Sequence, residues 1–208
     1  MPRKLHFQVV LFDGFDELDS IAPFEVLSAV AARLPGWRVE LVALDGPREI
    51  LANHGLRLHA PARLGPMSGP GRPDVVIVPG GGWADQSPQG ARAEVAGGRL
   101  PAALGELHQA GALVASVCTG AMLLAAAGLL KGRPAVTHHR ALEDLRAAGA
   151  EIVAARVVDA GDIVTAGGVT SGIDLALHLV ERFGGVKLAR GVADALEYRR
   201  DNRPWKKS

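Results

Sequence analysis

The sequence predicts an α/β fold in which a mostly parallel sheet carries helices on both faces, built as a single domain. Short apolar runs, several of them rich in valine, alternate with longer helical stretches. This alternation favours parallel strands joined by helical crossovers. Glycines and prolines separate the runs, as turn-forming residues do. With no internal repeat, one domain is expected over residues 4–200, followed by a basic tail over residues 201–208.

Composition and charge narrow the possible functions. The 208 residues are 48% hydrophobic and 22% charged, which is typical of a soluble globular chain that buries about 70% of its unfolded surface. No apolar run approaches the roughly 18 residues of a membrane span, and a net charge of +1 gives no field to attract nucleic acid. The N-terminus lacks the long apolar core of a secretory signal. A cytoplasmic location is expected, in keeping with one free cysteine, Cys118.

The first part of the chain predicts two strands and a helix before a long loop. Residues 5–12 are an apolar run that ends at an Asp-Gly turn, and residues 23–33 have a helical pattern that Pro-Gly stops. Residues 37–44 alternate as a strand does. Residues 48–58 look like a short hairpin or irregular edge, and the proline- and glycine-rich residues 61–73 are expected to be a loop.

Two apolar runs predict the central strands of the sheet. Residues 74–78 and 112–117 are almost wholly apolar, as in strands that are buried on both faces. A helical stretch with breaks is expected over 89–109, and an alanine- and leucine-rich helix over 119–130. The later elements are expected to be a strand at 135–137, a helix at 140–148, a hairpin of 157–158 with 163–164, and helices at 171–183 and 186–200.

The strongest functional signal surrounds Cys118, where a strand ends, a cysteine follows and an alanine-rich helix begins at once. This is the pattern of a nucleophile elbow, which presents its side chain above the carboxyl edge of the sheet. Gly120 and Ala121 are small enough for the tight turn. Unpaired N–H groups at the helix start favour a thiolate. We therefore predict a reactive nucleophile rather than the small buried hydrophobe that most lone cysteines are.

Two loops are expected to open at the same edge of the sheet. Gly80 and Gly81 follow a central strand and could aim backbone N–H groups at a developing negative charge. Glu17 and Asp19 follow the first strand. Asp19 either caps the helix that Pro23 can begin or takes a chemical role, and Glu17 is expected to be a solvated acid.

Two further segments carry polar side chains that could approach the site. Thr170 and Ser171 precede a late helix, and either is expected to cap it. His138 and His139 follow a short strand, and His138 could border the site. Adjacent side chains that point to different sides make a poor metal site, and a single cysteine excludes a zinc cluster with several cysteine ligands. No metal site is predicted.

Together these segments resemble the ThiJ/PfpI superfamily, whose fold is a flavodoxin-like, doubly wound sheet of the class I glutamine-amidotransferase type. The likeness covers nearly the whole chain, in order. The matching segments are Leu18-Asp19-x-x-x-Pro23, Val78-Pro79-Gly80-Gly81, Ser116-Val117-Cys118-Thr119-Gly120, Thr137-His138 and Thr165-Ala-Gly-Gly-x-Thr-x-Gly-Ile-Asp174. Within the superfamily the chain is most similar to isonitrile (isocyanide) hydratases, which also have Cys-Thr-Gly at the elbow, Leu-Asp after the first strand and Gly-Ile-Asp at a late helix.

The resemblance implies a hydro-lyase that converts isonitriles to N-substituted formamides. Cys118 would attack the terminal carbon while Asp19 delivers a proton, which gives a thioimidate that water then hydrolyses with Asp19 as base. Thr119 would assist through its hydroxyl and backbone N–H. The candidate groups for binding substrate or an oxyanion are those of Gly80, Gly81, Thr170 and His138. Such proteins are usually homodimers without a cofactor, so a small-molecule substrate and a second copy are the expected partners, and neither nucleic acid nor a membrane is.

Departures from the hydratase pattern leave other functions open. Ser20-Ile21-Ala22 and Trp83 stand where other residues are common in the hydratases, and both changes concern the expected pocket wall. Thr119 stands where glutaminase and peptidase members have a histidine after the cysteine, so proteolysis and glutamine hydrolysis are not expected. A thiol enzyme that acts on small carbonyl compounds such as glyoxals, and a non-enzymatic redox or ligand sensor, are the alternatives. Regulators of the AraC type share Cys-Thr-Gly, but the 25 residues after Phe183 are too few for their DNA-binding domain.

Overall fold

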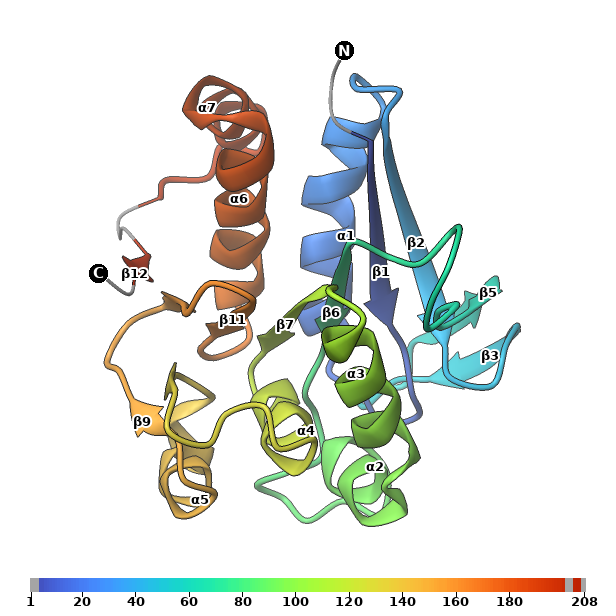
Figure 1. The fold of residues 1–208 in the computed structure, drawn as a ribbon, viewed down its shortest axis with the longest axis vertical. Coiled ribbons are helices and arrows are strands. Elements are labelled where there is room, and N and C mark those ends of the chain that lie inside the picture. The colour runs from blue at the N-terminus through green and yellow to red at the C-terminus, as the bar shows by residue number, and fades with distance from the viewer. Residues whose placement is uncertain (1–3, 201–203, 207–208) are drawn as a thin grey trace.

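An eight-stranded sheet runs through the computed structural model, which describes residues 4–200 and 204–206 (Figure 1). Its strand order is β12-β10-β11-β7-β6-β1-β2-β5, and all neighbouring pairs are parallel except β10 with β11. The strands are β1 (Leu5–Val10), β2 (Trp37–Ala43), β5 (Ala62–Arg63), β6 (Val75–Val78), β7 (Leu113–Val117), β10 (Val157–Asp159), β11 (Ile163–Ala166) and β12 (Trp205–Lys206). The predicted α/β class with a mostly parallel sheet is confirmed.

Helices cover both faces of this sheet, as predicted (Figure 1). One face carries α1 (Glu17–Ala31), α6 (Ser171–Gly184) and α7 (Val186–Ala195), and the other carries α2 (Ala91–Gly97), α3 (Arg99–Gln109) and α4 (Gly120–Ala126). The smaller elements are η1 (His139–Ala141), α5 (Leu142–Ala147), the hairpin of β3 (Arg48–Leu51) and β4 (Arg57–Ala60), and the pair of β8 (Pro134–Ala135) and β9 (Glu151–Ile152). No described helix has the length and apolar character needed to cross a bilayer.

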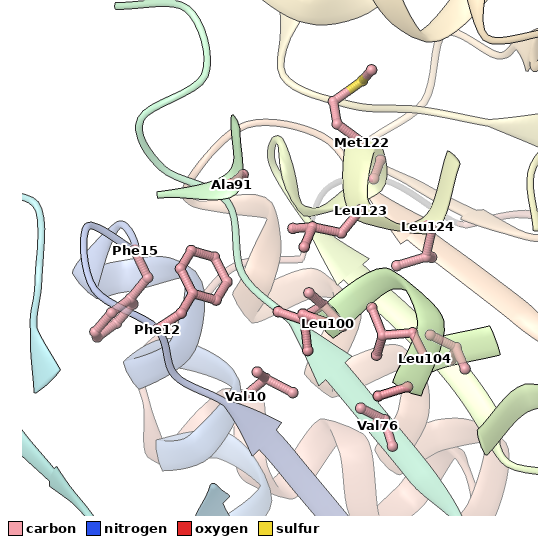
Figure 2. Packing of buried hydrophobic residues seen from close by; sticks show 14 of the residues in the cluster. Val10, Phe12, Phe15, Val76, Ala91, Leu100, Leu104, Met122, Leu123 and Leu124 are labelled. Carbon is pink, nitrogen blue, oxygen red and sulfur yellow. The ribbon is translucent and has the colours of Figure 1, made fainter. Parts of the chain in front are cut away.

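Strand β6 shows how side-chain alternation builds two hydrophobic cores. Val75 and Ile77 belong to the core under α1 and α6, whereas Val76 and Val78 belong to the core under α2 to α4. Both sets are fully buried, because successive side chains of a strand point to opposite faces. Figure 2 shows the second core, in which Val76 lies among leucines of α3 and α4. The continuous apolar run of the sequence follows from burial on both faces.

Helix α1 begins at Glu17 rather than at the predicted Pro23. Pro23 lies inside the helix, although it lacks the N–H that would donate to the Asp19 carbonyl. Its ring packs so tightly on α6 that a Cβ at Gly172 would come within 3.3 Å of it. The preference of proline for a helix start was overridden by this packing, and Asp19 therefore lies in the first turn of the helix rather than in a loop.

The two edges of the sheet also differ from the prediction. Strand β5 lies within residues 61–73, which were predicted as a loop, and pairs with β2. At the other edge β12, from the predicted tail, pairs in parallel with β10. Unpaired backbone groups at a sheet edge favour such additions, and composition alone did not indicate them. Residues 201–203 and 207–208 of the predicted tail lie outside the described residues.

A buried ionic cluster links α6 to strand β10. His178 Nε2 lies 2.7 Å from Asp159 Oδ2, and both side chains are buried. Arg182 Nη1 and the Gly161 N–H also donate to this carboxylate, at 3.1 and 2.9 Å from Oδ1. Burial alone would raise the pKa of Asp159, but the hydrogen bonds from His178 and Gly161 and the charge of Arg182 lower it overall.

We expect Asp159→Asn to lower the free energy of unfolding by about 3 kcal/mol, because His178 and Arg182 lose their shared carboxylate. The native pKa lies below the unfolded value of about 3.9, so this contribution is present above that value and is lost as the pH falls through the native pKa. Urea denaturation between about pH 7 and pH 3 measures both effects. Glu143→Gln, which removes an exposed ion pair with Arg146, should cost less than about 0.5 kcal/mol. An equally small loss for Asp159→Asn would contradict the prediction.

Candidate active site

Cys118 occupies the predicted elbow, directly after β7 and before α4. Its φ angle is +55°, in the left-handed region that residues other than glycine rarely adopt. Three contacts hold this conformation: the Cys118 N–H donates to the carbonyls of Ala166 (3.1 Å) and Gly167 (2.7 Å), and the Thr137 hydroxyl donates to the Cys118 carbonyl at 2.8 Å. The strained backbone is thus fixed by neighbouring segments on more than one side.

Asp19 approaches the same thiol from the first turn of α1. Its side chain is fully buried, and Oδ2 accepts a hydrogen bond from the Gly80 N–H at 2.9 Å. Burial and the negative charge of Asp16 raise the pKa of Asp19 well above its usual value. The Gly80 N–H and the nearby Cys118 thiol oppose this rise without cancelling it. The carboxyl group therefore keeps its proton to a higher pH than an exposed aspartic acid does.

The pKa of the Cys118 thiol is raised, whereas the sequence favours a thiolate. Burial raises its pKa most, and the negative charges of Asp19 and Asp16 raise it further. The Thr119 N–H at the start of α4 lowers the pKa of Cys118, as expected from the sequence, but by less. The sequence prediction included only the effect of the helix start, because the carboxylates that the fold brings near the sulfur cannot be located from sequence.

The backbone donors of Gly80 and Gly81 are occupied by protein groups. The Gly80 N–H bonds Asp19, and the Gly81 N–H donates to Thr119 Oγ1 at 3.0 Å. A Cβ at Gly80 would lie 2.4 Å from that hydroxyl oxygen, so glycine is required for the close approach of the two loops. The structure thus places these glycines as supports of Asp19 and Thr119 rather than as free donors to a substrate.

A pocket of about 150 Å³ opens above Cys118 and Thr119. Its walls combine aromatic, polar and acidic side chains. The lining residues are Asp16, Asn53, Gly81, Gly82, Trp83, Ala84, Asp85, Cys118, Thr119, His138, Arg140 and Val169. The structure therefore brings together Cys118, Asp19, Thr119, Gly81 and His138 of the sequence-predicted set, with Asp19 and Gly80 buried behind the pocket floor.

Thr170 lies apart from this group. Its side chain is exposed, is not part of the pocket lining, and accepts a hydrogen bond from Arg156 Nη2 at 3.1 Å. It occupies the N-cap position of α6 but makes no capping hydrogen bond. Helical φ and ψ angles at Thr170 direct the hydroxyl away from the helix start, so the predicted capping bond is absent.

His138 lines the pocket, and its pKa is lowered by burial and by the neighbouring His139 and Arg140. Its Nδ1 accepts a hydrogen bond from the Arg140 N–H at 3.2 Å. The rings of His138 and His139 are 4.2 Å apart, but only His138 lines this pocket, whereas His139 lines a separate one. Within the described residues no group of three or more His, Cys, Asp or Glu is arranged to hold a metal.

Sequence reasoning missed three residues around the pocket. Trp83 was noted only as a departure, yet its ring forms a wall that is fixed by a hydrogen bond to Asp144 Oδ2 (2.7 Å). Glu17, predicted to be solvated, accepts hydrogen bonds from the N–H and Nδ1 of His54, at 2.8 and 2.7 Å. These bonds hold the β3–β4 turn beside the pocket. Asp16 gave no signal beyond its place three residues before Asp19, a spacing that puts helical side chains side by side.

Comparisons with known proteins agree with this site. A model of the DJ-1/PfpI family matches residues 7–182. The chain is 35% identical over 202 residues to the isonitrile hydratase of Pseudomonas putida, which covers 93% of this chain and 78% of that one. It is 28% identical over 153 residues to a deglycase of Thermococcus kodakarensis, covering 74% and 84%. The structure of a ThiJ/PfpI family protein from Pseudomonas syringae superposes with a TM-score of 0.82 at 26% identity, covering 97% and 78%.

We expect Asp16→Asn to make Cys118 more reactive, because the charge of Asp16 raises the pKa of the thiol. The rate of alkylation by iodoacetamide at about pH 8 should rise threefold or more as the thiolate fraction grows. Asp85→Asn removes an exposed carboxylate from the same pocket and should leave the rate within about a factor of two, since solvent screens it. Equal rates for Asp16→Asn and the unmodified protein would show that Asp16 does not act on the thiol.

Proposed function

Because the chain belongs to the DJ-1/PfpI family, we propose that it hydrates isonitriles to N-substituted formamides, with Cys118 as nucleophile and Asp19 as proton carrier. One observation carries this proposal: the Cys118 thiol lies in the lining of a pocket with the buried Asp19 carboxyl group close behind it, and the pKa of each group is raised. The 35% identity to the isonitrile hydratase of Pseudomonas putida, over 93% of this chain, supports it.

The chemistry of an isonitrile suits this pair, because its terminal carbon must accept a nucleophile and then a proton. In the proposed first step the Asp19 carboxylate takes the thiol proton as the Cys118 sulfur bonds to that carbon. Asp19 then returns the proton to the same carbon. The product is a thioimidate, R–N=CH–S–Cys118, and it contains every atom of the isonitrile and the thiol. In this scheme a protonated thiol supplies the proton that the substrate carbon needs, and Asp19 is the base that carries it.

Water completes the proposed reaction. Asp19 takes a proton from water as the hydroxide adds to the thioimidate carbon, and that proton passes to the substrate nitrogen. Collapse of the tetrahedral adduct breaks the carbon–sulfur bond, and the hydroxyl proton returns to Cys118 through Asp19. One carboxyl group thus accepts and donates protons in both steps, which requires a pKa near the working pH. The raised pKa of Asp19 is consistent with that requirement.

Thr119 and His138 are proposed to orient the substrate. The Thr119 oxygen already accepts the Gly81 N–H, so its own proton is available to a nitrogen or oxygen in the pocket. His138 is held neutral by burial and by its basic neighbours, and it can contribute a polar wall without competing with Asp19 for protons. No equivalent part is proposed for Thr170, which lies outside the pocket.

A second function for the same thiol is favoured by the deglycase likeness, at 28% identity. In this alternative, Cys118 is the nucleophile of an enzyme that acts on a small carbonyl compound such as a glyoxal. The non-enzymatic alternative is a redox or ligand sensor that uses Cys118 as its switch. Methylglyoxal and an aliphatic isonitrile, assayed side by side, separate the enzymatic alternatives. A homodimer in the cytoplasm is part of the proposal, and light scattering of the purified protein tests the assembly.

We expect Cys118→Ser to abolish turnover of a small aliphatic isonitrile, and Asp19→Asn to reduce it by about 10²- to 10⁴-fold. Both losses follow from removing a group that bonds to, or exchanges a proton with, the reacting carbon. Formamide production is the measurement. Asp194→Asn, an exposed change of the same kind on α7, should keep full activity. Normal turnover by Cys118→Ser would refute the covalent scheme.

A covalent intermediate is the direct test of the mechanism. The unmodified protein, quenched in acid during turnover of an aliphatic isonitrile, should contain a fraction whose mass is increased by one isonitrile, because the thioimidate precedes hydrolysis. Peptide mapping should locate the adduct on Cys118, and Cys118→Ser should show none. If no adduct forms on the unmodified protein while iodoacetamide still alkylates the thiol, isonitrile hydration is the wrong function.

A further inference from the structure

A second pocket, of about 190 Å³, lies at the carboxyl edge of the sheet and shares no lining residue with the Cys118 pocket. It is lined by residues that follow β1 and β2 and by the helices α2 and α3 that follow β6. The chain runs from β1 to β2 on one side and later enters β6 on the other side of β1. Such a reversal of strand order opens a crevice where open α/β sheets commonly bind ligands.

The pocket has an apolar floor and a charged rim. The buried Val10, Leu11, Phe12 and Leu100 lie at its inner end, and the half-buried Leu44 and Ala93 add accessible apolar surface to form the floor. Figure 2 shows Val10, Phe12 and Leu100 packed in the core beneath it. The rim residues are Asp45, Arg48, Glu94 and Arg99. An apolar base with a few polar groups at one side is the usual construction of a small-molecule site.

The charges on the rim leave one carboxylate unpaired. Arg48 Nη1 donates to Asp13 Oδ2 at 2.8 Å, and Arg99 pairs with Asp45. The half-buried carboxylate of Glu94 has no hydrogen bond or ion pair within the part of the chain that the structure describes. Burial raises its pKa most, and the charges of Arg48 and Arg99 oppose the rise without cancelling it. A carboxylate removed from water without a partner is unfavourable, and a cation at this position would offset that cost.

We propose that this pocket binds a small organic monocation, a primary ammonium group on an apolar body, with Glu94 as its counter-ion. Because both arginines already have their own carboxylates, the rim has one negative charge to offer and no free cation for an anion. A cavity of about 150 Å³ is enough to hold benzene, so a pocket of about 190 Å³ accepts a body of roughly one six-membered ring. The ring lies on the apolar floor, and the ammonium group points to Glu94.

Cyclohexylammonium is a probe of this size and charge, and cyclohexanol is its neutral counterpart. Isothermal titration of the full chain should give millimolar binding of cyclohexylammonium, in keeping with the few atoms of the ligand, and binding of cyclohexanol at least tenfold weaker. Glu94→Gln should weaken cyclohexylammonium binding roughly tenfold by removing the charged acceptor. The fold should tolerate this change, because it removes a partly buried charge that has no partner.

Matched variants locate the site. Glu106→Gln on the exposed face of α3 and Asp16→Asn in the Cys118 pocket should both leave the affinity unchanged. Ala93→Phe, which extends into the second pocket from α2, should abolish binding. Equal affinity for cyclohexanol, unchanged affinity in Glu94→Gln, loss of affinity in Asp16→Asn, or no binding to the unmodified protein would each overturn the proposal.

Discussion

The conformation of Cys118 is the constraint on which the rest of the site depends. A residue other than glycine at a φ of +55° is unfavourable unless its surroundings hold it there. Here the carbonyls of Ala166 and Gly167 and the hydroxyl of Thr137 do so, which ties β7, β11 and the β8–η1 segment to one backbone position. Gly120 packs so closely that a Cβ would lie 2.3 Å from the Val78 carbonyl oxygen. The sheet edge is thus assembled around the elbow.

The same arrangement brings together three acidic groups, the carboxyl groups of Asp16 and Asp19 and the Cys118 thiol. Burial raises the pKa of Asp16, of Asp19 and of the thiol; the charge of Asp16 raises the pKa of both other groups, and the charge of Asp19 raises that of the thiol. The stability of the fold offsets the cost of holding these groups close together, because two apolar cores and a largely parallel sheet keep them in place. Such an arrangement makes it unfavourable for all of these groups to be ionised at once. An exposed thiol and carboxylate would instead exchange their protons with solvent.

The sequence predicted the features that depend on local pattern and missed those that depend on close tertiary approach. Alternation of apolar runs was enough for the sheet, and the strand–Cys–helix succession was enough for the elbow at Cys118. The start of α1 was misplaced because contact between Pro23 and Gly172 is invisible in sequence. For the same reason the N–H groups of Gly80 and Gly81 were expected to face a substrate, whereas loops distant in sequence use them. The pKa of the thiol was predicted from the helix start alone, whereas two carboxylates also act on it through space.

Different parts of the fold control the reacting groups and the pocket wall. Cys118 and Asp19 are positioned by the carboxyl edge of the sheet, but Trp83 is fixed by Asp144 of α5 and by the Arg92 guanidinium of α2, which lies 4.5 Å over its ring. Helices at the periphery can change without disturbing strand register, because few sheet contacts depend on them. The wall can therefore change in shape while the thiol–carboxyl pair stays fixed. This separation offers a physical reason why relatives of this chain can include both an isonitrile hydratase and a deglycase.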